Sequence, residues 1–305
     1  MRATLILLSA LALSHAVTLP AAAPKLLALR GGGGPVTTVA TVKPPAEAYF
    51  GMAEKGVANA KMPLMKILHQ SIMGGCYIGF GGLLSTIVSG TCPGVAASNP
   101  GLQKFIFAAC FPVNLLLILL SGGQLFTGNS AAVPAALFEG MLDFKDLVKS
   151  WSVSYIGNII GSLIFAWLAQ YTGLLHGGAG QMAIATVMKK TSAGFVPTLV
   201  KGIMCNWLVC MAVYLAGACS DLGGKMVGIW FPIFTFVSIG LEHSVANMFL
   251  LPLGILAGAD VTFYQAFVKN LVPVTIGNAI AGALIVGAGY SYAFGKLGGN
   301  DKKAA

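Results

Sequence analysis

Ionisable side chains are scarce in the apolar part of this chain, and two of them are adjacent. Of the four histidines, His243 alone lies deep within a long apolar stretch, directly after Glu242. An ionisable group at such a position is costly to bury, so it indicates a function. His243 could pass a proton near neutral pH, or it could be a neutral ring bound to a free backbone carbonyl. We expect Glu242 to point away from His243 and bind backbone amides, and Asn247 to share the helix face of His243.

The other reactive side chains do not form a recognisable catalytic or metal site. The six cysteines show no C-x-x-C or zinc spacing, and several lie inside apolar runs, which is typical of small buried side chains. No carboxylate pair, Ser/His/Asp set or His-rich motif accompanies His243. The sequence therefore predicts no cofactor and no enzyme. An intramembrane enzyme with His243 as general base stays open as an alternative, as does a membrane scaffold without a pore.

The composition indicates a protein that crosses a membrane several times. Of the 305 residues, 56% are apolar and 9% are charged, and the mean hydropathy is +0.83. A soluble domain usually carries about 25% charged residues. The net charge of +9 is spread along the chain, which argues against a nucleic-acid partner. The lipid bilayer is the partner that this composition predicts.

Charge-free stretches predict six spans, each of which needs about 20 apolar residues to cross the bilayer. They lie at about 67–88, within 105–138, from about 151, from about 195, within 226–259 and at about 271–292. The second and fifth stretches are too long for one straight helix and contain glycines near their centres. We therefore predict that spans 2 and 5 are broken near the midplane.

The chain contains an internal repeat of three spans, in which the order of the span types is the same in both halves. Gly157-Asn158 in the third span recurs as Gly277-Asn278 in the sixth, and each follows a broken span. Because three spans are an odd number, the second copy must insert with the opposite orientation. The predicted fold class is thus an all-α membrane protein with six transmembrane helices as a 3+3 inverted repeat, an arrangement found in transporters and channels.

The two ends of the chain differ in composition from this six-span part. Residues 1–16 have the pattern of a signal peptide, and residues 17–45 form a basic, acid-free leader that is transit-like or disordered. The six-span domain covers 46–295, and 296–305 are a polar C-terminal tail. Loops on the side of both termini hold more lysines than the opposite loops, which places the termini on the cytoplasmic or stromal side. The two-part leader favours a plastid envelope, with the plasma membrane as the alternative.

Several motifs together resemble the formate/nitrite transporter family, in order and spacing, from about Tyr49 to Phe294. The run from Glu242 to Phe249 is the most specific of them. The motifs that carry the resemblance are Gly79-Phe80-Gly81, Phe126-Thr127-Gly128-Asn129, Cys205-Asn206-Trp207-Leu208-Val209-Cys210, Glu242-His243-Ser244-Val245-Ala246-Asn247-Met248-Phe249 and Asn270-Leu271-Val272-Pro273-Val274-Thr275-Ile276-Gly277-Asn278.

The resemblance implies an aquaporin-like fold that assembles as a homopentamer with one pore in each protomer. It implies that Thr127 and His243 face each other across the pore from the two breaks, and that Lys190 lies in a vestibule. Asn247 and Asn206 belong to the same set of pore residues. The residues that fall where the family has its two apolar constrictions are Leu115, Leu125, Phe126 and Phe236. Three residues before the motif threonine the family often has an acid, whereas this chain has Gln124.

Together these observations predict a channel or transporter for small monovalent weak-acid anions, with nitrite or formate as the preferred substrates. Bicarbonate, lactate and hydrosulfide stay open as alternatives for the same pore. A bare anion is costly to move through apolar rings, whereas the neutral acid crosses more easily. We therefore expect the anion to take up a proton in or near the constriction, with His243 as donor or relay. The predicted partners are thus the anion and protons.

Overall fold

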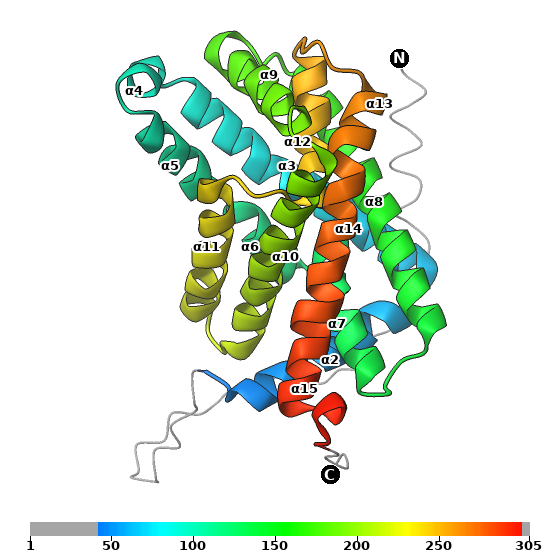
Figure 1. Ribbon diagram of the computed structural model, residues 1–305. Helices are drawn as coiled ribbons and strands as arrows, with labels where there is room; N and C mark the ends of the chain where they lie inside the picture. Colours follow the sequence, from blue (N-terminus) through cyan, green and yellow to red (C-terminus); the bar gives the residue numbers. More distant parts are fainter. Residues whose placement is uncertain (1–41, 301–305) are drawn as a thin grey trace, which may run out of the picture. The chain divides into compact units, whose positions relative to one another are not determined.

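The computed structural model describes residues 42–300, which form helices and the turns between them (Figure 1). The predicted signal peptide at 1–16 and most of the leader at 17–45 lie outside the described residues. Within the described part, six helices are long and apolar enough to span a membrane, which confirms an all-helical protein with six candidate spans. They are Leu64–Gly90, Pro100–Ser121, Phe144–Tyr171, Phe195–Ala218, Leu222–Ile239 and Phe263–Phe294.

Two apolar stretches are interrupted where the sequence has glycine. Helix α6 (Val113–Ser121) ends at Gly122, and α7 begins after the turn (Phe126–Phe138). In the same way α11 (Leu222–Ile239) ends at Gly240, and α12 follows (Ser244–Leu256). The two glycines have φ angles of 82° and 81°. Glycine reaches this left-handed conformation without the steric cost of a side chain, which explains its place at both helix ends.

The first and third spans of each half pack closely. Helix α3 (Leu64–Gly90) packs against α8 (Phe144–Tyr171), and α10 (Phe195–Ala218) packs against α14 (Val272–Ile280). A Cβ atom on Gly157 would collide with the Ser71 side chain, and one on Gly277 would collide with the Leu199 carbonyl. The glycine before each asparagine therefore lets the paired helices approach closely.

The remaining helices either lie outside the six spans or form segments of the second and sixth spans. The third span begins at Phe144, earlier than the sequence indicates, and its first turns contain Asp146. The sixth span contains two π-helical segments. The other elements are α2 (Pro45–Lys61), α4 (Pro93–Ser98), α5 (Pro100–Cys110), α9 (Gly177–Thr191), α13 (Phe263–Ala266), η2 (Phe267–Leu271), η3 (Ala281–Ala288), α15 (Gly289–Phe294) and η4 (Lys296–Gly298).

The N-terminal part of helix α2 and the segment before it are anchored to the body of the protein. The Lys43 amide donates to the Ala218 carbonyl at 2.9 Å. The Tyr49 hydroxyl donates to Glu139 Oε1 at 2.7 Å, and the Ser291 hydroxyl donates to the same oxygen at 2.6 Å. Glu139 thus joins α2, the end of α7 and the C-terminal helix. Burial of the Tyr49 side chain raises the pKa of its hydroxyl well above the ordinary tyrosine value.

Candidate functional site

Each helix interruption is held by an asparagine side chain, and the two asparagines make equivalent sets of hydrogen bonds. Asn158 Oδ1 accepts a hydrogen bond from the Phe126 amide at 2.9 Å, and its Nδ2 donates to the carbonyls of Ser71 (2.8 Å) and Gln124 (2.9 Å). Each of these bonds joins the third span to the first span or to the break. Because the side chain fills both donor and acceptor roles, it satisfies backbone groups that a broken helix leaves free.

Asn278 makes the corresponding three bonds in the second half. Its Oδ1 accepts from the Ser244 amide at 2.8 Å, and its Nδ2 donates to the carbonyls of Gly202 (2.8 Å) and Glu242 (3.1 Å). Both asparagines are fully buried. The repeated Gly-Asn motif was the sequence signal for them, but the sequence alone did not assign them a role. The inverted orientation of the two halves stays a prediction.

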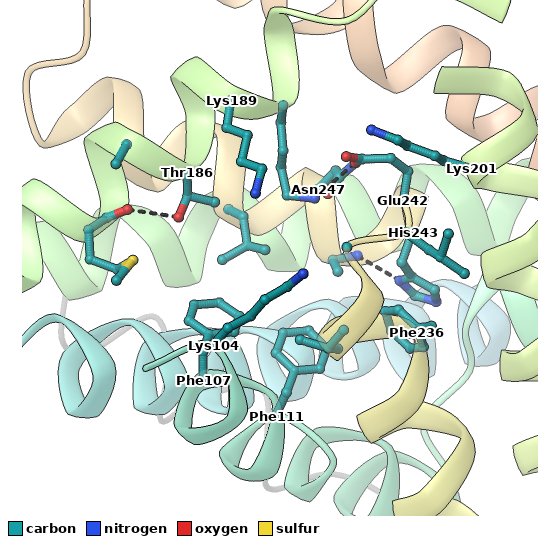
Figure 2. Close-up of a pocket in the computed structure, with 18 of the residues that line it drawn as sticks. Lys104, Phe107, Phe111, Thr186, Lys189, Lys201, Phe236, Glu242, His243 and Asn247 are labelled. Carbon is teal, nitrogen blue, oxygen red and sulfur yellow. Dashed lines mark hydrogen bonds and ion pairs between the residues drawn. The ribbon is translucent and has the colours of Figure 1, made fainter. Parts of the chain in front are cut away.

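His243 connects the two interruptions. Its Nδ1 accepts a hydrogen bond from the Ala246 amide at 2.9 Å, and its Nε2 lies 3.0 Å from Thr127 Oγ1. Since Nδ1 is an acceptor, the neutral ring carries its proton on Nε2 and donates it to the threonine hydroxyl. The ring is 3% exposed. The imidazole ring of His243 stacks on the Phe236 ring, with ring centroids 5.7 Å apart (Figure 2).

Glu242 belongs to a buried ion pair beside this histidine. Its Oε2 accepts from Lys190 Nζ at 2.9 Å and from Asn247 Nδ2 at 2.7 Å, with Asn270 Nδ2 at 3.2 Å. The expectation that Glu242 binds backbone amides was therefore wrong, because side-chain donors surround its carboxylate. Figure 2 shows Glu242 turned toward Asn247 and away from the His243 ring. Asn247 lines the same cavity as His243, and its side chain bonds Glu242 and Asn270.

Two cavities lie beside residues of the two interruptions: His243 lines the larger one, and Leu125 and Gly128 line the smaller one. The larger cavity, of about 420 Å³, is lined by His243, Phe236 and Asn247. Its cationic lining residues are Lys104, Lys189, Lys190 and Lys201. The smaller cavity, of about 40 Å³, is lined by Leu115, Leu125 and polar residues of α2 and the first interruption.

The predicted pore residues occupy three kinds of position. Lys190, Phe236, His243 and Asn247 line the larger cavity, and Leu115 and Leu125 line the smaller one. Thr127 is fully buried and lines neither cavity.

Phe126 and Asn206 line neither cavity. The Phe126 ring packs edge-on against Trp151 and Tyr155, with centroids 5.6 and 5.1 Å apart. Asn206 Nδ2 donates to Ser130 Oγ at 2.8 Å and to the Asn278 carbonyl at 2.7 Å, so this asparagine supports the helices behind the site.

The sequence analysis missed several residues that complete the site. Phe111 and Leu241 line the larger cavity beside Phe236, and Asn270 bonds the Glu242 carboxylate. Phe111 and Leu241 resemble any other apolar residue in a span, so no local pattern distinguishes them. Asn270 lies in the motif that begins the sixth span, but its partners come from distant segments.

Six candidate spans, two interrupted helices and a lysine-lined cavity that reaches a buried histidine define a multi-pass membrane protein with the architecture of a channel or transporter. Residues 46–292 match the sequence profile of the formate/nitrite transporter family. The chain therefore belongs to that family, whose members are transporters and channels rather than enzymes.

Individual relatives and solved structures agree with this assignment. A probable formate transporter of Methanothermobacter thermautotrophicus is 40% identical over 270 residues, which cover 83% of this chain and 97% of the relative. A formate channel of Bacillus thuringiensis is 36% identical, with 82% and 95% covered. The fold is similar to that of an ion channel of the same family, with a TM-score of 0.74, 26% identity and coverage of 81% and 98%. A pentameric formate channel with formate bound gives a TM-score of 0.67 at 30% identity, with coverage of 76% and 97%.

Proposed function

We propose that this protein is a transmembrane channel or transporter for small monovalent weak-acid anions, with formate or nitrite as substrate. The observation that carries this proposal is the buried His243–Thr127 contact, with one cavity that reaches His243 and a second that is lined by Leu125 and Gly128, close to Thr127 in the sequence. The relatives named formate transporter and formate channel support the same substrate class. The likeness to a pentameric formate channel supports a homopentamer with one pore in each protomer.

The lysines of the larger cavity attract the anion, and the apolar residues next to His243 favour its neutral form. Positive charge in a cleft raises the local concentration of anions. Phe111, Phe236 and Leu241 then surround the approach to the imidazole, where a bare anion loses its hydration. Leu115 and Leu125 form the apolar constriction on the other side. The substrate crosses between these groups as the protonated acid.

His243 acts in this step as a proton relay with Thr127. The anion gains one proton and becomes the neutral acid; this proton comes from a hydronium ion in the larger cavity and passes through the imidazole, which is neutral before and after the step. The first amides of the two half-helices are already bound by Asn158, Asn278 and His243 Nδ1. Those three amides are therefore not available to hold the anion, and the Nε2–H and the Thr127 hydroxyl are side-chain donors at the crossing point.

Flux of labelled formate and nitrite into proteoliposomes tests this function directly. We expect uptake by the wild-type protein that rises as the external pH falls, because the proton that His243 passes to the anion comes from the external solution. His243→Asn removes the proton relay and is expected to flatten this pH dependence. His176→Asn is a matched control, because His176 is exposed and lies in a connection before α9. Wild-type liposomes that take up neither anion would refute the proposed function, and an unchanged pH profile in His243→Asn would refute the relay.

The finer cellular assignment rests on the leader and the lysine distribution. We place the protein in a plastid envelope with both termini on the stromal side, and a plastid supplies a use for imported nitrite. Residues 1–45 fused to a fluorescent protein are expected to direct it to plastids. Fluorescence at the plasma membrane would instead support the alternative location.

A further inference from the structure

The positions of Gln124 and Glu242 are structurally equivalent. The Gln124 amide donates to the Gln70 carbonyl at 3.1 Å, and the Glu242 amide donates to the Lys201 carbonyl at 3.4 Å. The carbonyl of Gln124 accepts from Asn158, and that of Glu242 accepts from Asn278. Each residue therefore has its backbone held by the first and third spans of its own half, just before the half-helix begins.

Asparagines also recur at the same distance from these two residues. Asn129 follows Gln124 by five positions and donates to Gln124 Oε1 at 3.0 Å. Asn247 follows Glu242 by five positions and donates to Glu242 Oε2 at 2.7 Å. The two places thus share a backbone arrangement and an asparagine donor, and they differ in whether the central side chain carries a charge.

The side chains around Gln124 form a neutral chain of amides. Asn59 Nδ2 donates to Asn129 Oδ1 at 2.8 Å, Asn129 donates to Gln124, and Gln124 Nε2 donates to Gln70 Oε1 at 2.9 Å. All these bonds run in one direction, so the amide dipoles are aligned and strengthen one another. Asn59, Gln124 and Asn129 are each less than 8% exposed.

The amide chain lies on the wall of the smaller cavity. Asn59, Gln124 and Asn129 line it together with Lys55, which is its only ionisable lining residue among the described residues. Among those residues no hydrogen-bond donor contacts the side-chain oxygen Oδ1 of Asn59. The side-chain Nδ2 groups of Asn59 and Asn129 each have a second N–H beyond the one that donates in the bonds given above. A volume of about 40 Å³ accommodates a few water-sized groups.

We propose that Gln124, Asn129 and Asn59 form an uncharged binding station for the substrate, opposite the lysine-lined cavity. This inference rests on the proposed function. The free N–H groups can donate to the oxygens of a small carboxylate or nitrite, and the free carbonyl can accept the O–H of the acid. Gln124 keeps this position without charge, whereas a carboxylate there would place a negative charge on the path of the anion. The two ends of the pore then differ, since one attracts charge and the other binds either protonation state by hydrogen bonds.

Formate flux through Gln124→Glu at different ionic strengths tests this station. The variant keeps the size of the side chain but adds a charge and removes the donor to Gln70. Repulsion between unpaired charges is strongest when the salt concentration is low. We expect flux to fall about ten-fold at about 20 mM salt and to recover partly at about 300 mM salt. Wild-type flux is expected to decrease over the same range, because salt screens the lysines of the larger cavity.

Gln124→Met is the matched uncharged variant, with similar size and no amide. The station predicts a higher half-saturating formate concentration in this variant and a salt dependence like that of the wild type. Wild-type kinetics in Gln124→Met would overturn the proposal, and so would a loss in Gln124→Glu that is equal at both salt concentrations. If Gln124→Glu does not yield folded protein, Gln124→Met decides alone. Wild-type liposomes without formate flux would refute the proposed function itself, whereas normal wild-type flux with unaffected variants would refute only the station.

Discussion

The hydrogen bonds of Asn278 allow a quantitative prediction about the second interruption. In Asn278→Leu, a side chain of similar size loses all three bonds to the backbone. The Glu242 carbonyl lies in the turn between α11 and α12 and the Ser244 amide begins α12, so both lose the partner that the asparagine supplied. Leaving a buried polar group unpaired costs about 1–3 kcal/mol. We therefore expect the free energy of unfolding to fall by about 4 kcal/mol, which is about a thousandfold in the unfolding equilibrium.

Denaturant titration of the protein in lipid nanodiscs, followed by tryptophan fluorescence, measures this change. Asn158→Leu loses the matching set of bonds in the first half and is expected to be destabilised by a similar amount. Asn99→Leu is the control, because Asn99 is exposed and makes a single cap bond to the Leu102 amide, worth about 1 kcal/mol. If Asn278→Leu were no less stable than Asn99→Leu, these asparagines would not hold the interruptions.

Three further predictions concern packing, charge and pH. Gly277→Ala places a Cβ against the Leu199 carbonyl and is expected to destabilise the protein by about 1–3 kcal/mol in the same titration, and an unchanged midpoint would contradict the close approach. Lys190→Met leaves the Glu242 carboxylate without its cation, so we expect a loss of about 3 kcal/mol that the added change Glu242→Gln largely restores. The raised pKa of Tyr49 means that its contribution is fully present below about pH 10 and is lost as the pH rises further, because the unfolded chain ionises first. Tyr49→Phe should therefore lose less stability than the wild type on going above pH 10, and equal losses would argue against this role.

The sequence predicted the large features of the fold because they depend on composition and local pattern. Long apolar stretches must be helical in a bilayer, so six candidate spans followed from the hydropathy alone. Glycines in the middle of two stretches located the turns at Gly122 and Gly240. The sequence did not predict helix α2 or α9, because neither is apolar enough to be recognised as a span.

The candidate site was predicted only in part. His243 was identified because an ionisable residue among apolar neighbours is unusual, and its neighbour Thr127 followed from the family motif. The partners of Glu242 were misjudged, since a helix-face argument considers only residues nearby in the sequence. Lys190 and Asn270 come from other elements and bring the carboxylate into an ion pair.

The sequence by itself determined that this chain crosses a membrane, where its helices are interrupted, and which family it resembles. These features follow from the free energy of placing each residue in lipid and from motifs that are continuous along the chain. Only the tertiary structure decided that Nδ1 of His243 accepts from its own helix while Nε2 faces Thr127. It also decided that an ion pair occupies one half and a chain of amides the other. Apart from the bond to Nδ1, these contacts join residues 50 or more positions apart, and hydrogen bonds depend on distances and angles that no local pattern specifies.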